Sequence, residues 1–142
     1  MKMSPVVHFE MGYRDKDRMV KFYETAFGWK TNAMGEDMGN YVIAQTGPTD
    51  EATRMPQEPG FINGGFYPKT DSPSSHAPSV VISVDDIKQA VEEVKKAGGK
   101  ILGGMTPEGN RTMEPTMIPG VGLWISFEDT EGNRVSILQP RN

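Results

Sequence analysis

The feature that most constrains the fold is a strand–helix unit that occurs twice in the chain. The first copy is PVVHFEMGYRDKDRMVKFYETAFGW, residues 5–29, and the second is PSVVISVDDIKQAVEEVKKAGGK, residues 78–100. Each copy begins with the pattern of a half-buried strand and continues with apolar residues at helical spacing. An offset of roughly seventy residues predicts two similar modules that share one domain.

The first strand, expected from Val6 to Met11, has two faces of different chemistry. Alternation places Phe9 and Met11 on one face and His8 and Glu10 on the other. The apolar face is expected to pack on the helix that follows. An imidazole and a carboxylate two residues apart would then point the same way from the free face.

Both helices have an apolar stripe and an acidic residue in position to cap the N-terminus. A side-chain oxygen at that point accepts a hydrogen bond from an otherwise unpaired backbone N–H. Asp15 or Asp17 suits the first helix, and Asp85 or Asp86 suits the second. The stripes expected to be buried are Met19, Phe22, Tyr23 and Phe27 in the first helix, and Ile87, Ala90, Val91, Val94 and Ala97 in the second.

The remaining segments complete each module with three more strands. The result is an α+β fold of two βαβββ modules, in which the free sheet faces form a cleft suited to a ligand. We expect a single domain, 1–142, with module one at about 5–68, a linker at 69–77 and module two at 78–140. Expected strands lie within 30–45 and at 60–68, 100–104, 121–128 and 134–139; 105–120 is expected to be a mobile loop, and 129–133 a hairpin turn.

Composition excludes several classes of function. The net charge of −4, with no basic run, argues against a nucleic-acid partner. The chain has no cysteine, which excludes disulfides and thiolate chemistry. No apolar run is long enough to span a membrane, and residues 1–8 have no signal-peptide core, so we expect no membrane partner and a cytoplasmic location.

Several segments together resemble the vicinal oxygen chelate superfamily, which includes glyoxalases, bleomycin-resistance proteins and extradiol dioxygenases. Within it the chain is most similar to the uncharacterised lactoylglutathione lyase-related branch. The segments are VHFEM leading into FYETAFGW, NGGFYP, VDDIKQAVEEVKKAGGK and GLWISFEDTEGNRVSILQP, and they span nearly the whole chain. The resemblance implies a glyoxalase-like fold. It does not select one function, because this fold carries lyases, isomerases, epimerases, dioxygenases and non-catalytic binders.

The resemblance also implies where metal-dependent members take their ligands. The positions are on the first and last strand of each module, and they correspond here to His8, Gly64, Val81 and Ser136. His8 is the only matching ligand, whereas a divalent ion needs three or four. We therefore expect no metal ligand set and no cofactor, although an unconventional divalent site built on His8, Glu10 and a loop carboxylate stays open.

His8 and Glu10 are the candidate catalytic residues. One interpretation is a general base, or an imidazole that binds a ligand, with a pKa tuned by the neighbouring carboxylate. The other is a structural polar pair hydrogen-bonded across the sheet. Sequence alone does not separate the two, because both kinds of pair look alike in it.

The candidate ligand-binding residues lie in module two. Trp124 is placed to stack on a ligand, although a lone Trp packs in a core or interface at least as often. Arg134 is a candidate partner for an anionic substrate, with a solvent-facing role as the alternative. Ser136 and Ser83, on the last and first expected strands of module two, are the other two candidate ligand-binding residues.

Three functions remain open from the sequence. The first is a glyoxalase/bleomycin-resistance-like protein that binds a small molecule in the inter-module cleft without the usual divalent metal, with or without transforming it. The second is a metal-dependent lyase, isomerase or dioxygenase with a rearranged site. The third is a non-enzymatic sequestering protein or interaction subunit. The resemblance also implies a homodimer.

Overall fold

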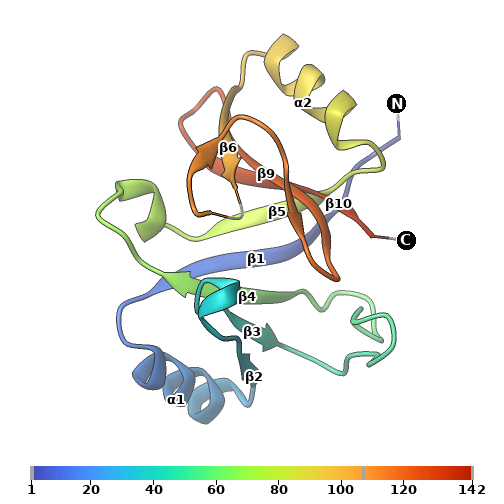
Figure 1. Ribbon diagram of the computed structural model, residues 1–142. Coiled ribbons are helices and arrows are strands. Elements are labelled where there is room, and N and C mark those ends of the chain that lie inside the picture. Colours follow the sequence, from blue (N-terminus) through green and yellow to red (C-terminus); the bar gives the residue numbers. More distant parts are fainter. Residues whose placement is uncertain (1, 107, 142) are drawn as a thin grey trace. The chain divides into compact units, whose positions relative to one another are not determined.

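The computed structural model describes residues 2–106 and 108–141, which form two compact units. We call His8–Pro78 the first module; the residues before His8 and after Pro78 form the second module. Each module combines strands with one α-helix of the described chain (Figure 1). The α+β class predicted from the sequence is confirmed.

The first module contains four strands in the order β2-β3-β4-β1. Strand β1 pairs in parallel with β4, and the other neighbours pair antiparallel. The elements are β1 (Val6–Tyr13), α1 (Lys16–Phe27), β2 (Lys30–Ala33), the 3-10 helix η1 (Glu36–Met38), β3 (Val42–Gln45) and β4 (Asn63–Pro68).

The second module repeats this topology with two short additional strands. Its order is β5-β10-β9-β6-β7, with β8 beside β9, and β5 pairs in parallel with β10. The first strand therefore pairs with the last in both modules, as duplication predicts. The elements are β5 (Ser79–Ser83), α2 (Ile87–Lys96), β6 (Lys100–Met105), β7 (Arg111–Thr112), β8 (Thr116–Ile118), β9 (Gly122–Glu128) and β10 (Arg134–Pro140).

Helix α1 begins and ends as the sequence predicts. The Asp15 carboxylate accepts a hydrogen bond of 3.0 Å from the Arg18 N–H, so Asp15 rather than Asp17 is the cap. Gly28 ends the helix with φ 68°, a left-handed conformation that glycine adopts without strain.

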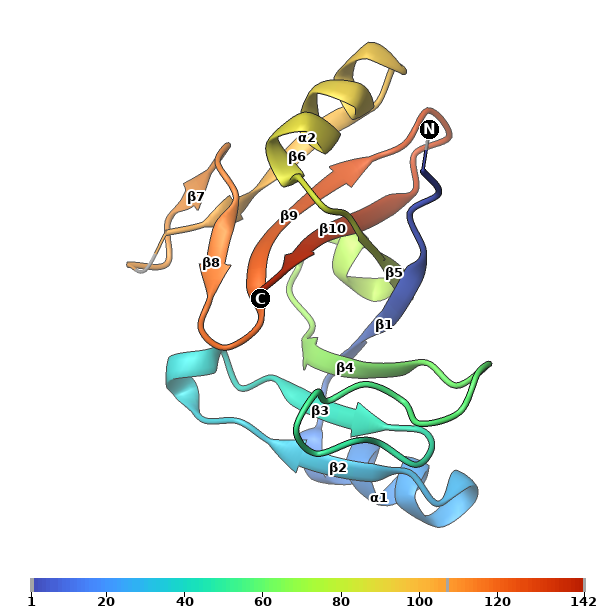
Figure 2. The same cartoon turned by 90° about the vertical axis from the view of Figure 1, so that its right-hand side faces the viewer.

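The helix covers one face of the first sheet, but only part of its expected stripe is enclosed. Met19, Val20 and Tyr23 pack against the cluster of Val42, Ala44 and Phe66, and Figure 2 shows α1 behind that sheet. Phe22 and Phe27 remain 57% and 63% exposed, so their predicted burial is wrong. Phe22 lies at the edge of the stripe, and Phe27 is the last residue of the helix.

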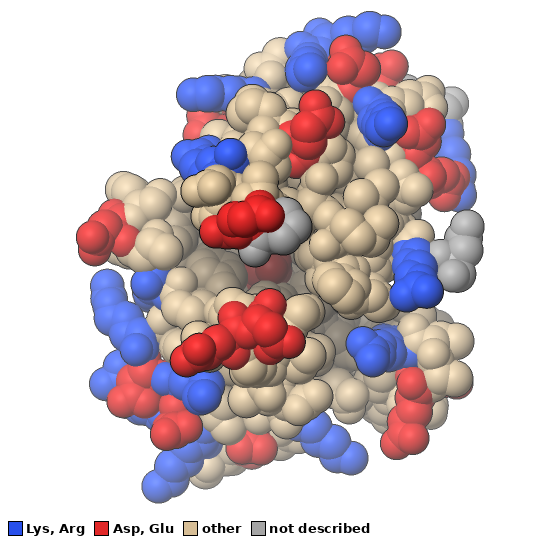
Figure 3. All heavy atoms as spheres, in the orientation of Figure 1, with Lys and Arg blue, Asp and Glu red and all other residues tan. Residues whose placement is uncertain are grey.

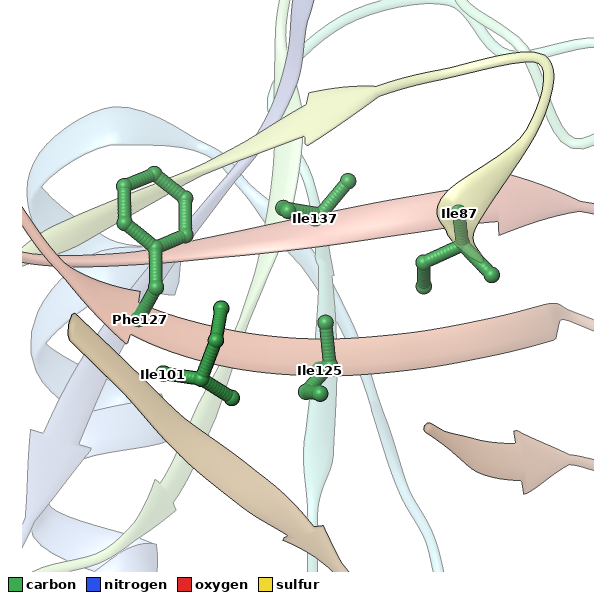
Figure 4. Close-up of a cluster of buried hydrophobic side chains, with 5 residues drawn as sticks. All are labelled: Ile87, Ile101, Ile125, Phe127 and Ile137. Atoms are coloured by element: carbon green, nitrogen blue, oxygen red, sulfur yellow. The ribbon is translucent and has the colours of Figure 1, made fainter. Parts of the chain in front are cut away.

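Helix α2 is anchored more deeply. Asp86, not Asp85, caps it by accepting a hydrogen bond of 3.1 Å from the Gln89 N–H. Ala90, Val91 and Val94 pack on the core as predicted, whereas Ala97 is exposed at the helix end. The five buried core residues, shown in Figure 4, are Ile87, Ile101, Ile125, Phe127 and Ile137.

Two segments have more structure than their composition predicts. The loop expected at 105–120 contains β7 and β8, with the Thr116 hydroxyl hydrogen-bonded to the Met105 backbone. The linker expected at 69–77 contains the 3-10 helix η2 (Pro73–His76), whose Ser75 is buried and bonds backbone groups of the same segment. The predicted hairpin at 121–139 is confirmed as β9 and β10.

In the described part of the chain, no helix has the length and apolar character needed to cross a bilayer.

Candidate functional site

His8 and Glu10 lie on the face of β1 that points away from α1. Their neighbours Phe9 and Met11 pack with the α1 cluster on the opposite face. His8 is partly buried and Glu10 is 9% exposed. Strand alternation therefore places the two candidate residues as predicted.

The two side chains are joined by a tyrosine from outside the first strand. The Tyr41 hydroxyl lies 3.0 Å from His8 Nε2 and donates a hydrogen bond of 3.2 Å to Glu10 Oε2. Because this hydroxyl has one proton and gives it to Glu10, the consistent arrangement has His8 donating from Nε2–H to the tyrosine oxygen. His8, Tyr41 and Glu10 thus form a hydrogen-bonded chain, which we call the His8–Tyr41–Glu10 chain.

Two adjacent glycines of β4 make room for large rings, one on each face of the sheet. A Cβ on Gly65 would collide with the Tyr41 ring, so that ring lies directly over Gly65. A Cβ on Gly64 would collide with the ring of Phe9 on the other face. Close approach by a neighbouring group is thus the reason for glycine in NGGFYP.

Burial sets the protonation states of the chain. Loss of hydration lowers the pKa of His8 from 6.5 to about 4, so the imidazole is neutral near pH 7. Burial, followed by the charge and hydrogen bond of Glu10, raises the pKa of Tyr41 well above its ordinary value, and the phenol keeps its proton. The second imidazole nitrogen, Nδ1, makes no hydrogen bond within the described residues and is not fully enclosed.

The four candidate ligand-binding residues share one face of the second sheet, the face away from α2. Residues that pair across neighbouring strands point to the same face of the sheet. Leu138 of β10 pairs with both Trp124 of β9 and Ser83 of β5, and Arg134 of β10 pairs with Glu128 of β9. Ser136 pairs with Val81 and Ser126, while its neighbour Ile137 belongs to the α2 core. The structure thus brings Trp124, Ser136, Arg134 and Ser83 to one surface, as their alternation predicts.

Ser136 is the most enclosed polar group of this face. It is 0% exposed, and its hydroxyl has no hydrogen-bond partner within the described residues. The adjacent Ser126 hydroxyl, by contrast, donates to the Gly103 carbonyl at 3.1 Å. An unpaired buried hydroxyl costs about 1–3 kcal/mol of stability.

A model of the Glyoxalase/Bleomycin resistance protein/Dioxygenase superfamily matches residues 6–137. The chain belongs to this superfamily. A relative from Didymella fabae, described as a glyoxylase-like domain-containing protein, is 31% identical over 130 residues, which cover 90% of this chain and 88% of the relative.

Solved structures share the fold. A hypothetical protein from Bacillus halodurans C-125 is 15% identical with a TM-score of 0.65, over 99% of this chain and 97% of its own. Methylmalonyl-CoA epimerase from Streptomyces coelicolor, in complex with 2-nitronate-propionyl-CoA, is 13% identical with a TM-score of 0.64, over 99% and 100% of the two chains. At this identity the likeness shows the fold alone.

The residues at the superfamily's ligand positions do not fit a divalent ion. His8 offers one imidazole, whereas Val81 has no donor atom and Ser136 offers only a neutral hydroxyl. The expected assignment of Gly64 is wrong: Gly64 lies on the α1 side with Phe9, and Asn63 is the β4 residue paired with His8. Within residues 2–106 and 108–141, no group of three or more His, Cys, Asp or Glu side chains is placed to hold a metal.

Asn63 and Tyr41 are the residues that the sequence reasoning missed. Asn63 is buried, with its amide committed to the Thr46 N–H and the Thr49 hydroxyl, both at 2.9 Å. It therefore anchors the loop that precedes β4. For Tyr41 the sequence held one indirect signal, the Gly64–Gly65 pair that leaves space for large rings.

Proposed function

We propose that the first-module sheet face carrying His8, Tyr41 and Glu10 binds a small molecule through hydrogen bonds, without a divalent metal. The observation that carries this proposal is the His8–Tyr41–Glu10 chain. Tyr41 holds the imidazole in one orientation and one tautomer, leaving Nδ1 as an acceptor with solvent access. A preorganised acceptor of this kind favours binding, because no side-chain ordering remains to be done.

The low basicity of His8 supports binding over general-base catalysis. A general base works best when its pKa lies near the operating pH. With a pKa of about 4, His8 takes up a proton at neutral pH only with a penalty of about 4 kcal/mol. The same neutral imidazole is a good acceptor for a ligand hydroxyl or amide N–H.

This chemistry indicates a ligand with a hydrogen-bond donor, such as a hydroxyl or an amide N–H. Epimerases of the same fold are solved with propionyl-CoA derivatives, so CoA esters are one class to test. Glutathione thioesters, bleomycin and catechols represent the other activities of the superfamily.

The second candidate is a metal-dependent enzyme with a rearranged site. The observation in its favour is that a neutral imidazole with an accessible nitrogen is also the metal-binding form of histidine. Against it stands the donor set, which supplies one imidazole and a Glu10 carboxylate already bonded to Tyr41.

The test uses the imidazole signals of the protein, because the chain has only two histidines, His8 and His76. Chelator-treated, ¹⁵N-histidine-labelled protein is titrated with propionyl-CoA, S-lactoylglutathione, bleomycin and catechol. His76, whose Nε2 is hydrogen-bonded to the Thr70 carbonyl at 2.8 Å, is the internal control. A saturable shift of the His8 signals alone is the expected result for at least one probe.

The other outcomes distinguish the alternatives. Shifts that occur only after Zn²⁺, Ni²⁺ or Mn²⁺ is added would overturn the metal-free proposal in favour of the metal-dependent enzyme. Unchanged His8 signals with every probe, with and without metal, would also contradict it and favour an interaction subunit. Equal shifts of His8 and His76 would indicate nonspecific binding.

A further inference from the structure

A basic hollow lies at the start of α1, where β1 ends. It has a volume of about 350 Å³ and is open to solvent. The residues that line it are Gly12, Tyr13, Arg14, Asp15, Arg18, Met19, Phe22, Tyr23 and Lys69. All of them belong to the first module, so the hollow is complete within one compact unit.

The hollow is positively charged although the chain as a whole has a net charge of −4. Arg14, Arg18 and Lys69 contribute three cations against the single carboxylate of Asp15. That carboxylate is already used, because Asp15 accepts the Arg18 backbone N–H as the cap of α1. Within the described residues, neither arginine nor Lys69 forms an ion pair. Figure 3 shows basic side chains, with acidic ones among them, over the part of the chain that Figure 1 draws as α1.

The backbone holds Lys69 in position at this hollow. Its N–H donates to the Tyr13 carbonyl at 2.9 Å, and its aliphatic stem lies over Gly12. A Cβ on Gly12 would come within 2.5 Å of Lys69 Cγ and 2.7 Å of the Ser75 carbonyl oxygen. Glycine at this position therefore allows the lysine stem to cross the end of β1.

An aromatic wall completes the hollow. Phe22 is 57% exposed, and its ring meets Tyr23 edge to face with the ring centroids 5.0 Å apart. Such exposure leaves one side of the Phe22 ring open to stack against an aromatic ring of a ligand.

The two arginines suit an anionic group, because guanidinium groups bind phosphate and carboxylate oxygens through paired N–H donors.

We infer that this hollow is a second binding site, for a small molecule that joins a phosphate or carboxylate group to an aromatic ring. The cations of Arg14, Arg18 and Lys69 bind the anionic group. The rings of Phe22 and Tyr23 contact the flat part. None of the residues that line the hollow belongs to the His8–Tyr41–Glu10 chain.

Phenyl phosphate is the probe, because it has both parts and nothing else. Calorimetric titration compares it with inorganic phosphate, which lacks the ring, and benzyl alcohol, which lacks the charge. We expect phenyl phosphate to bind more tightly than inorganic phosphate, and benzyl alcohol not to bind. Arg14→Gln and Arg18→Gln should each weaken phenyl phosphate by about five- to tenfold.

Two further variants locate the site. Lys21→Gln removes a cation from the same helix that does not line the hollow, and it should leave the affinity unchanged. Phe22→Ala should lower the affinity for phenyl phosphate to that for inorganic phosphate while leaving the latter unchanged. The exposed ring makes this variant safe for folding.

Three outcomes would overturn the inference. One is the absence of phenyl phosphate binding to the wild-type protein. Another is an equal loss in Lys21→Gln and Arg18→Gln, which would indicate general charge attraction. The third is an unchanged preference for phenyl phosphate in Phe22→Ala, which would remove the aromatic wall from the site.

Discussion

Tyr41 is the residue on which the polar site of the first module depends. Its hydroxyl contacts both His8 and Glu10, and its ring lies over Gly65. Tyr41→Phe keeps the ring but leaves the buried polar groups without their shared partner. We expect the free energy of unfolding to fall by about 1–3 kcal/mol, measured by urea denaturation at pH 7.

Tyr13→Phe is the matched control for this change. Its hydroxyl also donates one hydrogen bond, of 2.7 Å to the Asn40 carbonyl, but in an exposed position. The expected loss is therefore at most about 1 kcal/mol. If the two variants lose the same stability, the His8–Tyr41–Glu10 chain is not the specially buried network described above.

The lowered pKa of His8 makes stability depend on pH. The unfolded chain binds a proton on His8 near pH 6.5, whereas the folded chain does so only near pH 4. The contribution of His8 to the free energy of unfolding is therefore fully present above about pH 6.5. It falls as the pH drops through this interval and levels off below about pH 4. The full contribution is at most about 3 kcal/mol.

Urea denaturation between pH 7 and pH 4 measures this effect, with His8→Gln as the control. The variant cannot gain the proton, so its stability should fall less over this range. Equal slopes for the two proteins would contradict the burial of a neutral imidazole. The imidazole signals of the wild-type protein report the pKa of His8 directly.

At the scale of elements, the two helices differ in how deeply their apolar side chains are buried. Ile87 at the start of α2 is 0% exposed, whereas Phe22 in the middle of α1 is 57% exposed. Ile87→Ala should destabilise the protein by about 2–5 kcal/mol, because it leaves a cavity in the core. Phe22→Ala should cost no more than about 1.5 kcal/mol, because little apolar surface is lost from the interior. Thermal and urea unfolding of both variants give the comparison, and a loss above 3 kcal/mol for Phe22→Ala would place that ring in the core.

The start of α2 provides a second comparison, between two adjacent aspartates. Asp86 accepts the Gln89 N–H, whereas Asp85 forms an exposed ion pair with Lys2 at 2.9 Å. Asp86→Ala should lower the free energy of unfolding by about 1 kcal/mol. Asp85→Ala should change it by less than about 0.5 kcal/mol, because exposed ion pairs contribute little. A larger loss for Asp85→Ala would reverse the assignment of the cap.

These elements show what periodicity predicts and what it does not. Spacing identifies both helices and the inward stripe, since residues three and four apart share a face. The width of the buried stripe depends instead on how far the sheet extends beneath the helix. That extent is a tertiary property. The spacing therefore did not show that Phe22 and Phe27 would be exposed, or that Val20 would pack against the sheet.

At the scale of the whole molecule, the duplication carries most of the predictable information. Two strand–helix copies predict two modules of equal topology, and both have the parallel pairing of first and last strands. The position of Tyr41 was not predictable, because no spacing relates it to His8, Glu10 or Gly65. Such contacts depend on which loops the sheet order brings together.

The residues at the superfamily's ligand positions lead us to expect no tight metal binding. A divalent ion needs three or four protein ligands, and of the superfamily's positions only His8 supplies a strong one. Asn63, which pairs with His8, has its amide committed elsewhere. We therefore expect calorimetric titration of chelator-treated protein with Zn²⁺, Ni²⁺ or Mn²⁺ to show no stoichiometric binding that His8→Ala abolishes. Tight one-to-one binding lost in that variant would require further ligands around His8 and would make the chain a metal-dependent member of its superfamily.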